Sequence, residues 1–240
     1  MSLSLSPTSP TSSTSITFDF LQRFDNLIDH RFVLATRPPD GSAILEHSRL
    51  LETAIPKHIS LEQVHRSDVL KFDDYPPEEL QADGLITATP GLNISIHVSD
   101  CAPVYLLDPI IPAVGLIHCG WRPIAKGIIE NAISKLSDEF GSIPENIIAY
   151  IGPSIQMKDY EIGAELLEYF HNSSIRRLAC KFFLDIPNEI RYRMEKLGIA
   201  RDNIGRFPLS TFSEVSLCSY RRDRDDACSM TAIIGLKTIE

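Results

Sequence analysis

The sequence predicts a single α/β domain preceded by a flexible tail. Apolar runs of strand length and amphipathic helical segments interleave along residues 18–240, which is the pattern of sheets covered by helices. No segment repeats at a fixed period, and the composition does not change inside this range. Residues 1–17 are rich in serine, threonine and proline and carry no charged side chain, a composition typical of a flexible segment. We therefore expect a tail over residues 1–17 and one domain over residues 18–240.

Composition and charge narrow the classes of function. The chain is 43% hydrophobic, which is enough for a sizeable core. Its formal net charge of −9 argues against a nucleic-acid partner, because polyphosphate binding needs a basic surface. No apolar run approaches the ~20 residues of a membrane span, so no membrane partner is expected. The five cysteines are odd in number and lack paired spacing, which makes a poor disulfide framework and fits the reducing cytoplasm.

The first half of the domain contains mainly strand-like segments. Arg31–Thr36 is strand-like and stops at Pro38-Pro39, and Ile59–Leu70 forms two short strands on either side of His65. Ala43–Ile55 favours a helix, because its apolar residues recur at three-to-five spacing. Two further apolar runs of strand length follow, Leu92–Val98 and Ala113–Ile117.

The second half adds helices. The segment Pro123–Phe140 gives the strongest helical signal, because an isoleucine-rich stripe falls on one face, and Pro123 suits the first turn. Tyr160–His171 and Pro187–Leu197 predict two more helices, the second ending at Gly198. The remaining elements are a buried strand, a charged turn and a last strand, expected at Asn146–Ile151, Arg221–Asp226 and Met230–Leu236.

Two of the apolar strands lead to side chains that can bind a metal or attack a substrate. Cys101 follows Leu92–Val98, and His118 follows Ala113–Ile117. Together with His65, they offer two imidazoles and a thiolate, which suit Zn²⁺ and leave a fourth position open as in catalytic sites. The three residues lie 36 and 17 positions apart, which is no zinc-finger spacing, so the fold must bring them together.

The same residues also fit readings without a metal. Cys101 could be a nucleophile with His118 as its base, as in Cys/His hydrolases, or all three could be buried, hydrogen-bonded residues. Asp100 would point to the opposite face of a strand from Cys101, so a structural or supporting role is expected for it. Arg122 at a helix start and the pair Arg221-Arg222 in the charged turn could bind an anion, although a charged turn is usually solvated.

Eight short segments together resemble the YfiH family, whose members have been described as multicopper polyphenol oxidases, laccase-like proteins and peptidoglycan editing factors. They occur in the family's order over roughly residues 45–235, and they read LEQVH (61–65), ADGLIT (82–87), VSDCAPVYLLDP (98–109), HCGWR (118–122), KGI (126–128), IGPSI (151–155), YEIG (160–163) and SYRRD (219–223). The resemblance implies a single layered α/β/β/α-type domain with mixed sheets and outer helices.

The resemblance also implies an activity. It implies a catalytic zinc site made by His65, Cys101 and His118, with copper as the alternative metal. The reactions implied are phosphorolysis of adenosine, inosine, guanosine and methylthioadenosine, and deamination of adenosine. The partners expected are a purine nucleoside and phosphate, bound by a cytoplasmic monomer. The substrate and phosphate would be held by Arg49, Arg122 and Arg221, with Asp100 and Gln63 supporting the ligands.

The chain departs from the family pattern in several places. Arg66 replaces a glycine after the first histidine, HCGWRP replaces HAGWRG, and the IGPSI segment lacks the family's cysteine. Ser48 stands where asparagine is expected, and Cys228-Ser229 stands where Gly-Arg is usual. These differences leave the metal triad intact and concern the substrate and phosphate sites.

Three other functions are alternatives to that of a purine nucleoside enzyme, and the first is that of a copper-binding laccase-like oxidoreductase. A multicopper centre needs several imidazole clusters, whereas only two of the seven histidines fit the motif, so the residues can hold one metal. A copper-binding laccase-like oxidoreductase would therefore need more ligands than the motif supplies. The second function is that of a metal-free Cys/His hydrolase acting on an amide, such as a cell-wall precursor. The third is that of a binding or editing protein with a structural zinc.

Overall fold

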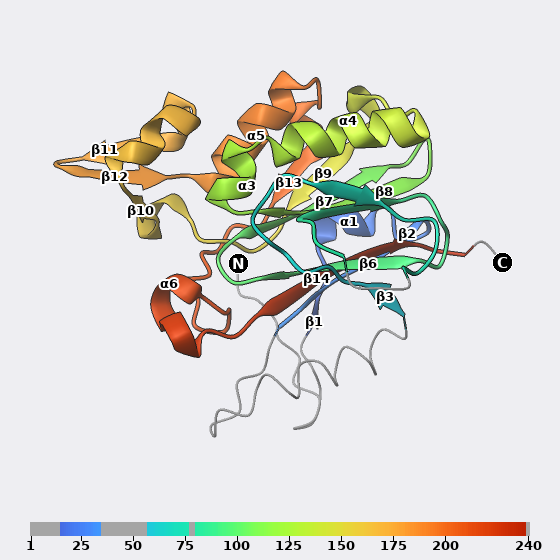
Figure 1. Cartoon of the computed structure of the whole chain (residues 1–240), viewed down its shortest axis with the longest axis horizontal. Helices are drawn as coiled ribbons and strands as arrows, with labels where there is room; N and C mark the ends of the chain where they lie inside the picture. Colours follow the sequence, from blue (N-terminus) through green and yellow to red (C-terminus); the bar gives the residue numbers. More distant parts are fainter. Residues whose placement is uncertain (1–14, 35–56, 77–79, 239–240) are drawn as a thin grey trace.

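Two β-sheets stack face to face, and helices cover the outer face of one of them (Figure 1). The computed structural model describes residues 15–34, 57–76 and 80–238. Within these ranges the predicted α/β fold with layered mixed sheets and outer helices is confirmed. No helix in the described ranges is long and apolar enough to cross a membrane.

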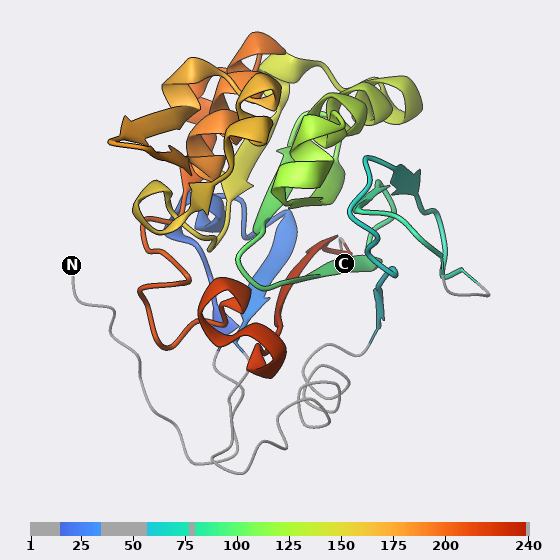
Figure 2. The same cartoon turned by 60° about the vertical axis from the view of Figure 1, so that its left-hand side comes forward.

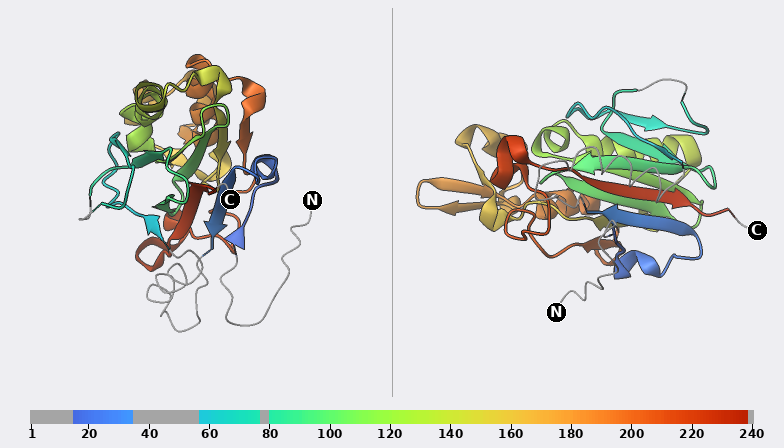
Figure 3. Two further views of the ribbon diagram at one scale, coloured as in Figure 1. Left: turned by 90° about the vertical axis from the view of Figure 1, so that its right-hand side faces the viewer. Right: turned by 90° about the horizontal axis from the view of Figure 1, so that it is seen from below.

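The first sheet has five strands, with the C-terminal strand at its centre (Figure 3, right). Strand β14 (Met230–Leu236) pairs antiparallel with β2 (Ile28–Val33) on one side and with β6 (Asn93–Val98) on the other. Short strands complete the two edges, β1 (Ser15–Ile16) beside β2 and β3 (His58–Ile59) beside β6. Strand β1 thus lies at the end of the segment expected to be a tail, whose residues 1–14 are outside the described ranges.

The second sheet has six strands, and one of them carries His118. Its centre is the antiparallel hairpin of β7 (Ala102–Asp108) and β8 (Ala113–Cys119). Both strands are buried at every position, because each face of this sheet is covered. The outer strands are β9 (Ile148–Ile151) and β13 (Ile204–Arg206) on one side, and β5 (Gly84–Thr87) and β4 (Val69–Lys71) on the other.

Successive side chains of β7 point to opposite faces of the sheet and enter two different hydrophobic cores. Tyr105 and Leu107 point into the core between the sheets, whereas Val104 and Leu106 point into the core beneath the helices. The phenol of Tyr105 donates a 3.0 Å hydrogen bond to the carbonyl oxygen of Arg31 in the facing sheet. The two sheets are therefore joined by apolar burial and by a polar contact.

An aromatic cluster closes one side of the core between the sheets. The ring of Phe18, just before helix α1 (Asp19–Gln22), stacks on Tyr150 with centroids 4.3 Å apart and meets Tyr105 edge-on at 5.5 Å. The Phe18 N–H donates to Nε2 of the buried His30, which fixes this turn onto β2.

Three helices cover the six-stranded sheet: α3 (Trp121–Ala125), α4 (Ile128–Phe140) and α5 (Ile186–Lys196). The predicted helix over Pro123–Phe140 is interrupted, because Gly127 has φ +87° and separates α3 from α4. Helix α5 agrees with its prediction and is capped by Asp185, whose carboxylate accepts the N–H of Asn188.

The helix predicted over Tyr160–His171 is wrong. Here the chain forms strand β10 (Glu161–Ile162) and a 3₁₀ helix, η3 (Ala164–Tyr169). Strand β10 pairs with β12 (Lys181–Leu184), which also pairs with β11 (Ile175–Leu178), so these three strands form a small projecting sheet (Figure 1). Tertiary pairing of the backbone has overridden a helical pattern in the sequence.

Two further expectations need correction. The charged turn Arg221–Asp226 contains a short helix, α6 (Tyr220–Asp223), followed by the 3₁₀ helix η6 (Arg224–Asp226). The cysteines were expected to lack a disulfide, but Cys218 and Cys228 are bonded.

The other 3₁₀ helices of the described residues are η1 (Pro144–Asn146), η2 (Met157–Asp159), η4 (Asn172–Ser174) and η5 (Arg201–Asn203). The helix expected over Ala43–Ile55 lies outside the described residues.

Candidate active site

The fold brings the three predicted metal ligands together. His65 lies in the loop between β3 and β4, Cys101 in the bend between β6 and β7, and His118 in β8. Their ligand atoms all lie within 4.8 Å of one another, and the two imidazole rings meet edge-on with centroids 4.8 Å apart. His118 is buried and His65 is exposed, so the cluster is rooted in the sheet and opens outward.

Asp83 orients this cluster, and the sequence analysis did not single it out. Its fully buried carboxylate lies 2.8 Å from Nδ1 of His118, which leaves Nε2 of that ring for the cluster. The same carboxylate accepts the backbone N–H groups of His65 at 3.0 Å and Arg66 at 2.6 Å. It therefore fixes both the ring of one histidine and the loop of the other, where His65 adopts φ +55°. The only signal in the sequence was its place directly before the apolar strand GLIT.

The electrostatics of the cluster favour a thiolate at Cys101. Burial alone would raise the pKa of this thiol, but the imidazoles of His118 and His65 outweigh burial and lower the pKa from 9.0 to about 6. Burial lowers the pKa of His118, but Cys101 and Asp83 together raise it above its ordinary value. Burial likewise opposes ionisation of Asp83, yet its bonds to His118 and to the backbone hold its pKa below the ordinary value. A thiolate next to two imidazoles is a donor set that fits one soft or borderline metal ion.

Gly120 makes room for the sulfur. A Cβ atom at this position would lie 2.7 Å from Sγ of Cys101 and 3.7 Å from Cδ2 of His65. Because real Cβ atoms do not approach other atoms so closely, a side chain here would displace the thiol. The glycine of the HCGWR motif is thus explained by contact with the cluster.

A pocket of about 660 Å³ lies over the cluster. It is bounded by the loop of His65, helix α3, Tyr160 just before β10, and helix α6. Helix α3, strand β10 and helix α6 lie at the same end of the molecule (Figures 1 and 2). Aromatic and cationic side chains share the walls of the pocket. They are Trp121, Tyr160 and Tyr220, and Arg122, Arg221 and Arg224.

Two of the three arginines predicted to bind substrate and phosphate lie in this pocket, with different partners. The guanidinium of Arg122 lies over the ring of Trp121 at 4.4 Å and is exposed. That of Arg221 lies 5.1 Å from the ring centre of Tyr160 and donates to the carbonyl oxygen of Glu161. Burial raises the pKa of Tyr160, so its hydroxyl is neutral. Arg49 lies outside the described residues.

Asp100 and Gln63 support the site through the backbone. Asp100 lies in a bend with φ +82°, where its carboxylate accepts the Thr211 hydroxyl at 2.5 Å and the Arg221 N–H at 2.6 Å. Gln63 bonds both the N–H and the carbonyl oxygen of His97 in β6. Both residues line the pocket, and both anchor neighbouring segments.

Fold and cluster together define a mixed α/β protein with a His-Cys-His site that lines a pocket. The chain belongs to the family described as multi-copper polyphenol oxidoreductase laccase, whose model matches residues 39–237. Curated relatives in this family include the purine nucleoside phosphorylase YfiH of Escherichia coli strain K12, which is 33% identical over 174 residues and covers 70% of each chain. A purine nucleoside phosphorylase of Aquifex aeolicus is 31% identical over 174 residues, covering 72% of this chain and 81% of its own. The predicted membership of the YfiH family is therefore confirmed.

Solved structures share the fold. The YfiH protein of Bacillus licheniformis superposes with a TM-score of 0.81 at 24% identity, covering 90% of this chain and 95% of its own. YlmD of Geobacillus stearothermophilus superposes with a TM-score of 0.79 at 23% identity, covering 88% and 92%. At sequence identities below 25%, these superpositions show a shared fold.

Proposed function

We propose that this protein is a zinc-dependent purine nucleoside phosphorylase that also deaminates adenosine. The observation that carries the proposal is the His65–Cys101–His118 cluster, which opens into a pocket walled by aromatic rings and guanidinium groups. The names of the curated relatives support the nucleoside as substrate. The substrates expected are adenosine, inosine, guanosine and methylthioadenosine.

His65, Cys101 and His118 would hold the zinc ion. Two imidazoles and one thiolate match the preferred donors of zinc, and three protein ligands leave one position for substrate or water. A bound zinc ion would supply Lewis-acid polarisation at that position. Copper is the alternative metal, but a multicopper centre needs further imidazole clusters.

The walls of the pocket have roles of their own in phosphorolysis. The rings of Trp121, Tyr160 and Tyr220 offer flat faces for a purine, and Arg122 and Arg221 offer charge for phosphate. A phosphate oxygen would form a bond to ribose C1′ as the bond from C1′ to the purine nitrogen breaks. The base leaves with that electron pair and takes up a proton, so free base and ribose 1-phosphate result. Arg49 stays a prediction for the same phosphate.

Deamination would use water in the same pocket. The water oxygen adds to C6 of adenosine, ammonia leaves, and inosine is the product. The buried carboxylate of Asp83, 2.8 Å from Nδ1 of His118, would hold that imidazole in one orientation during this reaction.

Product analysis tests the proposal. Metal-replete protein incubated with adenosine and phosphate should yield adenine with ribose 1-phosphate, and inosine or hypoxanthine. Cys101→Ala should abolish both reactions, whereas Cys180→Ala, at an exposed free cysteine, should retain them. Absence of turnover by zinc-loaded protein on every one of these nucleosides would refute the proposal.

A second function is favoured by one observation. The lowered pKa of Cys101 beside His118, with Asp83 behind that ring, is also the arrangement of a Cys/His hydrolase acting on an amide. Elemental analysis separates the two functions. Near-stoichiometric zinc that is lost in His65→Ala supports the first, whereas metal-free activity blocked by a thiol alkylator supports the hydrolase. Bound zinc without any turnover would indicate a binding or editing protein.

We further propose that the protein works in the cytoplasm as a monomer. A zinc-binding thiolate must stay reduced, and Cys101, Cys119 and Cys180 are free thiols. Light scattering of the purified protein measures the oligomeric state, and fractionation of source cells tests the compartment.

A further inference from the structure

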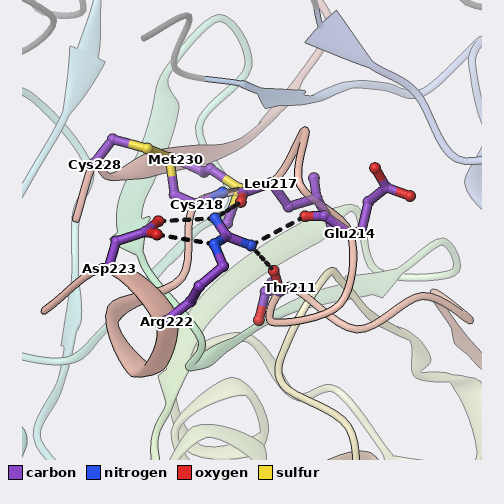
Figure 4. Close-up of a disulfide and its surroundings, with 8 residues drawn as sticks. All are labelled: Thr211, Glu214, Leu217, Cys218, Arg222, Asp223, Cys228 and Met230. Atoms are coloured by element: carbon purple, nitrogen blue, oxygen red, sulfur yellow. Dashed lines mark hydrogen bonds and ion pairs between the residues drawn. A yellow bond between two sulfur atoms is a disulfide. The ribbon is translucent and has the colours of Figure 1, made fainter. Parts of the chain in front are cut away.

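One wall of the pocket comes from a short segment closed by a disulfide. Tyr220, Arg221, Arg224 and Ser229 line the pocket, and all four lie between or next to the bonded residues Cys218 and Cys228. The two cysteines are ten positions apart, with their Cα atoms 5.3 Å from each other. The disulfide, drawn in Figure 4, therefore closes the loop that carries three of these residues, and Ser229 follows directly after it.

The first half of this loop is also held by a network around Arg222. The guanidinium of Arg222 donates to the carbonyl oxygens of Thr211 and Leu217 at 2.9 and 2.8 Å and forms an ion pair with Asp223 (Figure 4). The Arg221 N–H is bound by Asp100, next to Cys101. These bonds fix the start of helix α6 to the body of the protein.

The second half of the loop is more exposed than the first. Residues 224–226 are exposed, and Arg224 adopts φ +53°. The chain then returns to the core at Cys228, two positions before β14 begins at Met230. Cys218 is 2% exposed and its N–H contacts the sulfur of Met230, so the buried partner is firmly placed. The disulfide joins the exposed half of the loop to this fixed point.

We propose that Cys218–Cys228 is a reversible redox site that controls the order of this pocket wall. Cys228 is half-buried whereas Cys218 is buried, so Cys228 is the partner more open to an incoming thiolate. A small-molecule thiolate forms a bond to that sulfur, the Cys218–Cys228 bond breaks, and Cys218 leaves as a thiolate that takes up a proton. A second thiol then displaces Cys228 and leaves as the small-molecule disulfide, so two electrons reach the protein. The reverse exchange, with a small-molecule disulfide as oxidant, closes the loop again.

Reduction changes the wall without touching the cluster. Residues 224–228 lose their covalent link to Cys218, so Arg224 and Ser229 gain freedom, whereas His65, Cys101 and His118 lie on other segments. Weaker placement of the wall predicts poorer substrate binding with little change at the reacting centre. The site is defined by the loop itself and is independent of which reaction the pocket performs.

Limited proteolysis and thiol mapping test the proposal on the full-length zinc-loaded protein. Glutathione buffers of defined ratio are used, because dithiol reductants also bind zinc. In oxidising buffer, alkylation under denaturing conditions should label three of the five cysteines, and after reduction all five. Trypsin should cut after Arg224 on the order of tenfold faster in reducing buffer, because the open loop samples cleavable conformations more often.

Variants set the controls. Cys228→Ser should be cut at the fast rate in both buffers, and Cys180→Ser should respond to the buffer as the wild type does. If Cys228→Ser folds poorly, the reduced wild type supplies the same comparison. Equal cleavage rates in the two buffers, or five free thiols at every glutathione ratio, would overturn the proposal. Where turnover is measurable, reduction should raise KM for the nucleoside more than it changes kcat. If the protein shows no turnover of nucleosides, the proposed function fails, and the proteolysis rates still test the redox proposal.

Discussion

At the scale of single residues, Asp83 contacts two parts of the cluster at once. Its carboxylate meets the His118 ring and the backbone of the loop that carries His65. Because it acts through these histidines, it is a positioning residue for the site.

Asp83→Asn is predicted to weaken zinc binding by about 10- to 100-fold, the usual effect of losing such a partner of a ligating histidine. An asparagine matches the shape but carries no charge to hold the imidazole. Competition with a chromogenic chelator measures the affinity. Asp68→Asn, an exposed carboxylate on the same loop, should leave affinity unchanged. An unaltered affinity in Asp83→Asn would exclude the positioning role.

His30 gives the protein a predicted weakness in acid. Burial lowers its pKa below the ordinary 6.5, although Asp25 and Asp29 oppose that shift. The unfolded chain therefore binds the proton at higher pH than the folded protein, and stability falls as pH drops below about 6.5 towards the folded-state pKa. Protonation would also cost the bond from the Phe18 N–H, because a protonated Nε2 cannot accept.

Urea unfolding at about pH 8 and about pH 5 measures this dependence. His30→Gln should be less stable than wild type at the higher pH and should lose less stability on acidification. The same loss in both proteins would show that other groups govern the acid response.

At the scale of elements, the break between α3 and α4 depends on one glycine. Gly127 has φ +87°, a conformation that costs a residue with a Cβ roughly 1–2 kcal/mol. Gly127→Ala should therefore lower the free energy of unfolding by about that amount, measured by urea titration. Ser137→Ala on the exposed face of α4 is the matched control and should have little effect. A neutral Gly127→Ala would mean that the junction relaxes without strain.

Elements with a strong local pattern could be predicted from the sequence, and those set by distant contacts could not. Strand β14, helix α5 and the apolar face of α4 follow from periodicity and capping, which are local properties. Tyr160–His171 carries a helical pattern, but its first residues pair with Phe182 and Phe183, some twenty positions along the chain. The ligand triad became predictable through matched motifs rather than spacing. The role of Asp83 could not be predicted from the sequence, because only the fold places its carboxylate against His118.

At the scale of the whole molecule, the two sheets are held together across one buried layer. The hydroxyl of Tyr105 in β7 donates a hydrogen bond across this layer to the carbonyl oxygen of Arg31 in β2. Tyr105→Phe should lower the free energy of unfolding by about 0.5–1.5 kcal/mol, because the ring is kept and only the hydrogen bond is lost. Tyr169→Phe, at an exposed ring, should be neutral in the same denaturation assay. Equal stability of Tyr105→Phe and wild type would show that the bond contributes nothing net.

The central position of β14 has a consequence for how the protein is made. The ribosome synthesises a chain from its N-terminus onward. Strands β2 and β6 both pair with β14, which is formed by residues 230–236 and is therefore synthesised after them. During synthesis, each of these strands therefore presents an unpaired edge to the surrounding solution until the last strand arrives. Nascent chains of this protein should consequently depend on chaperones, and translation stalled before residue 230 should yield aggregating products.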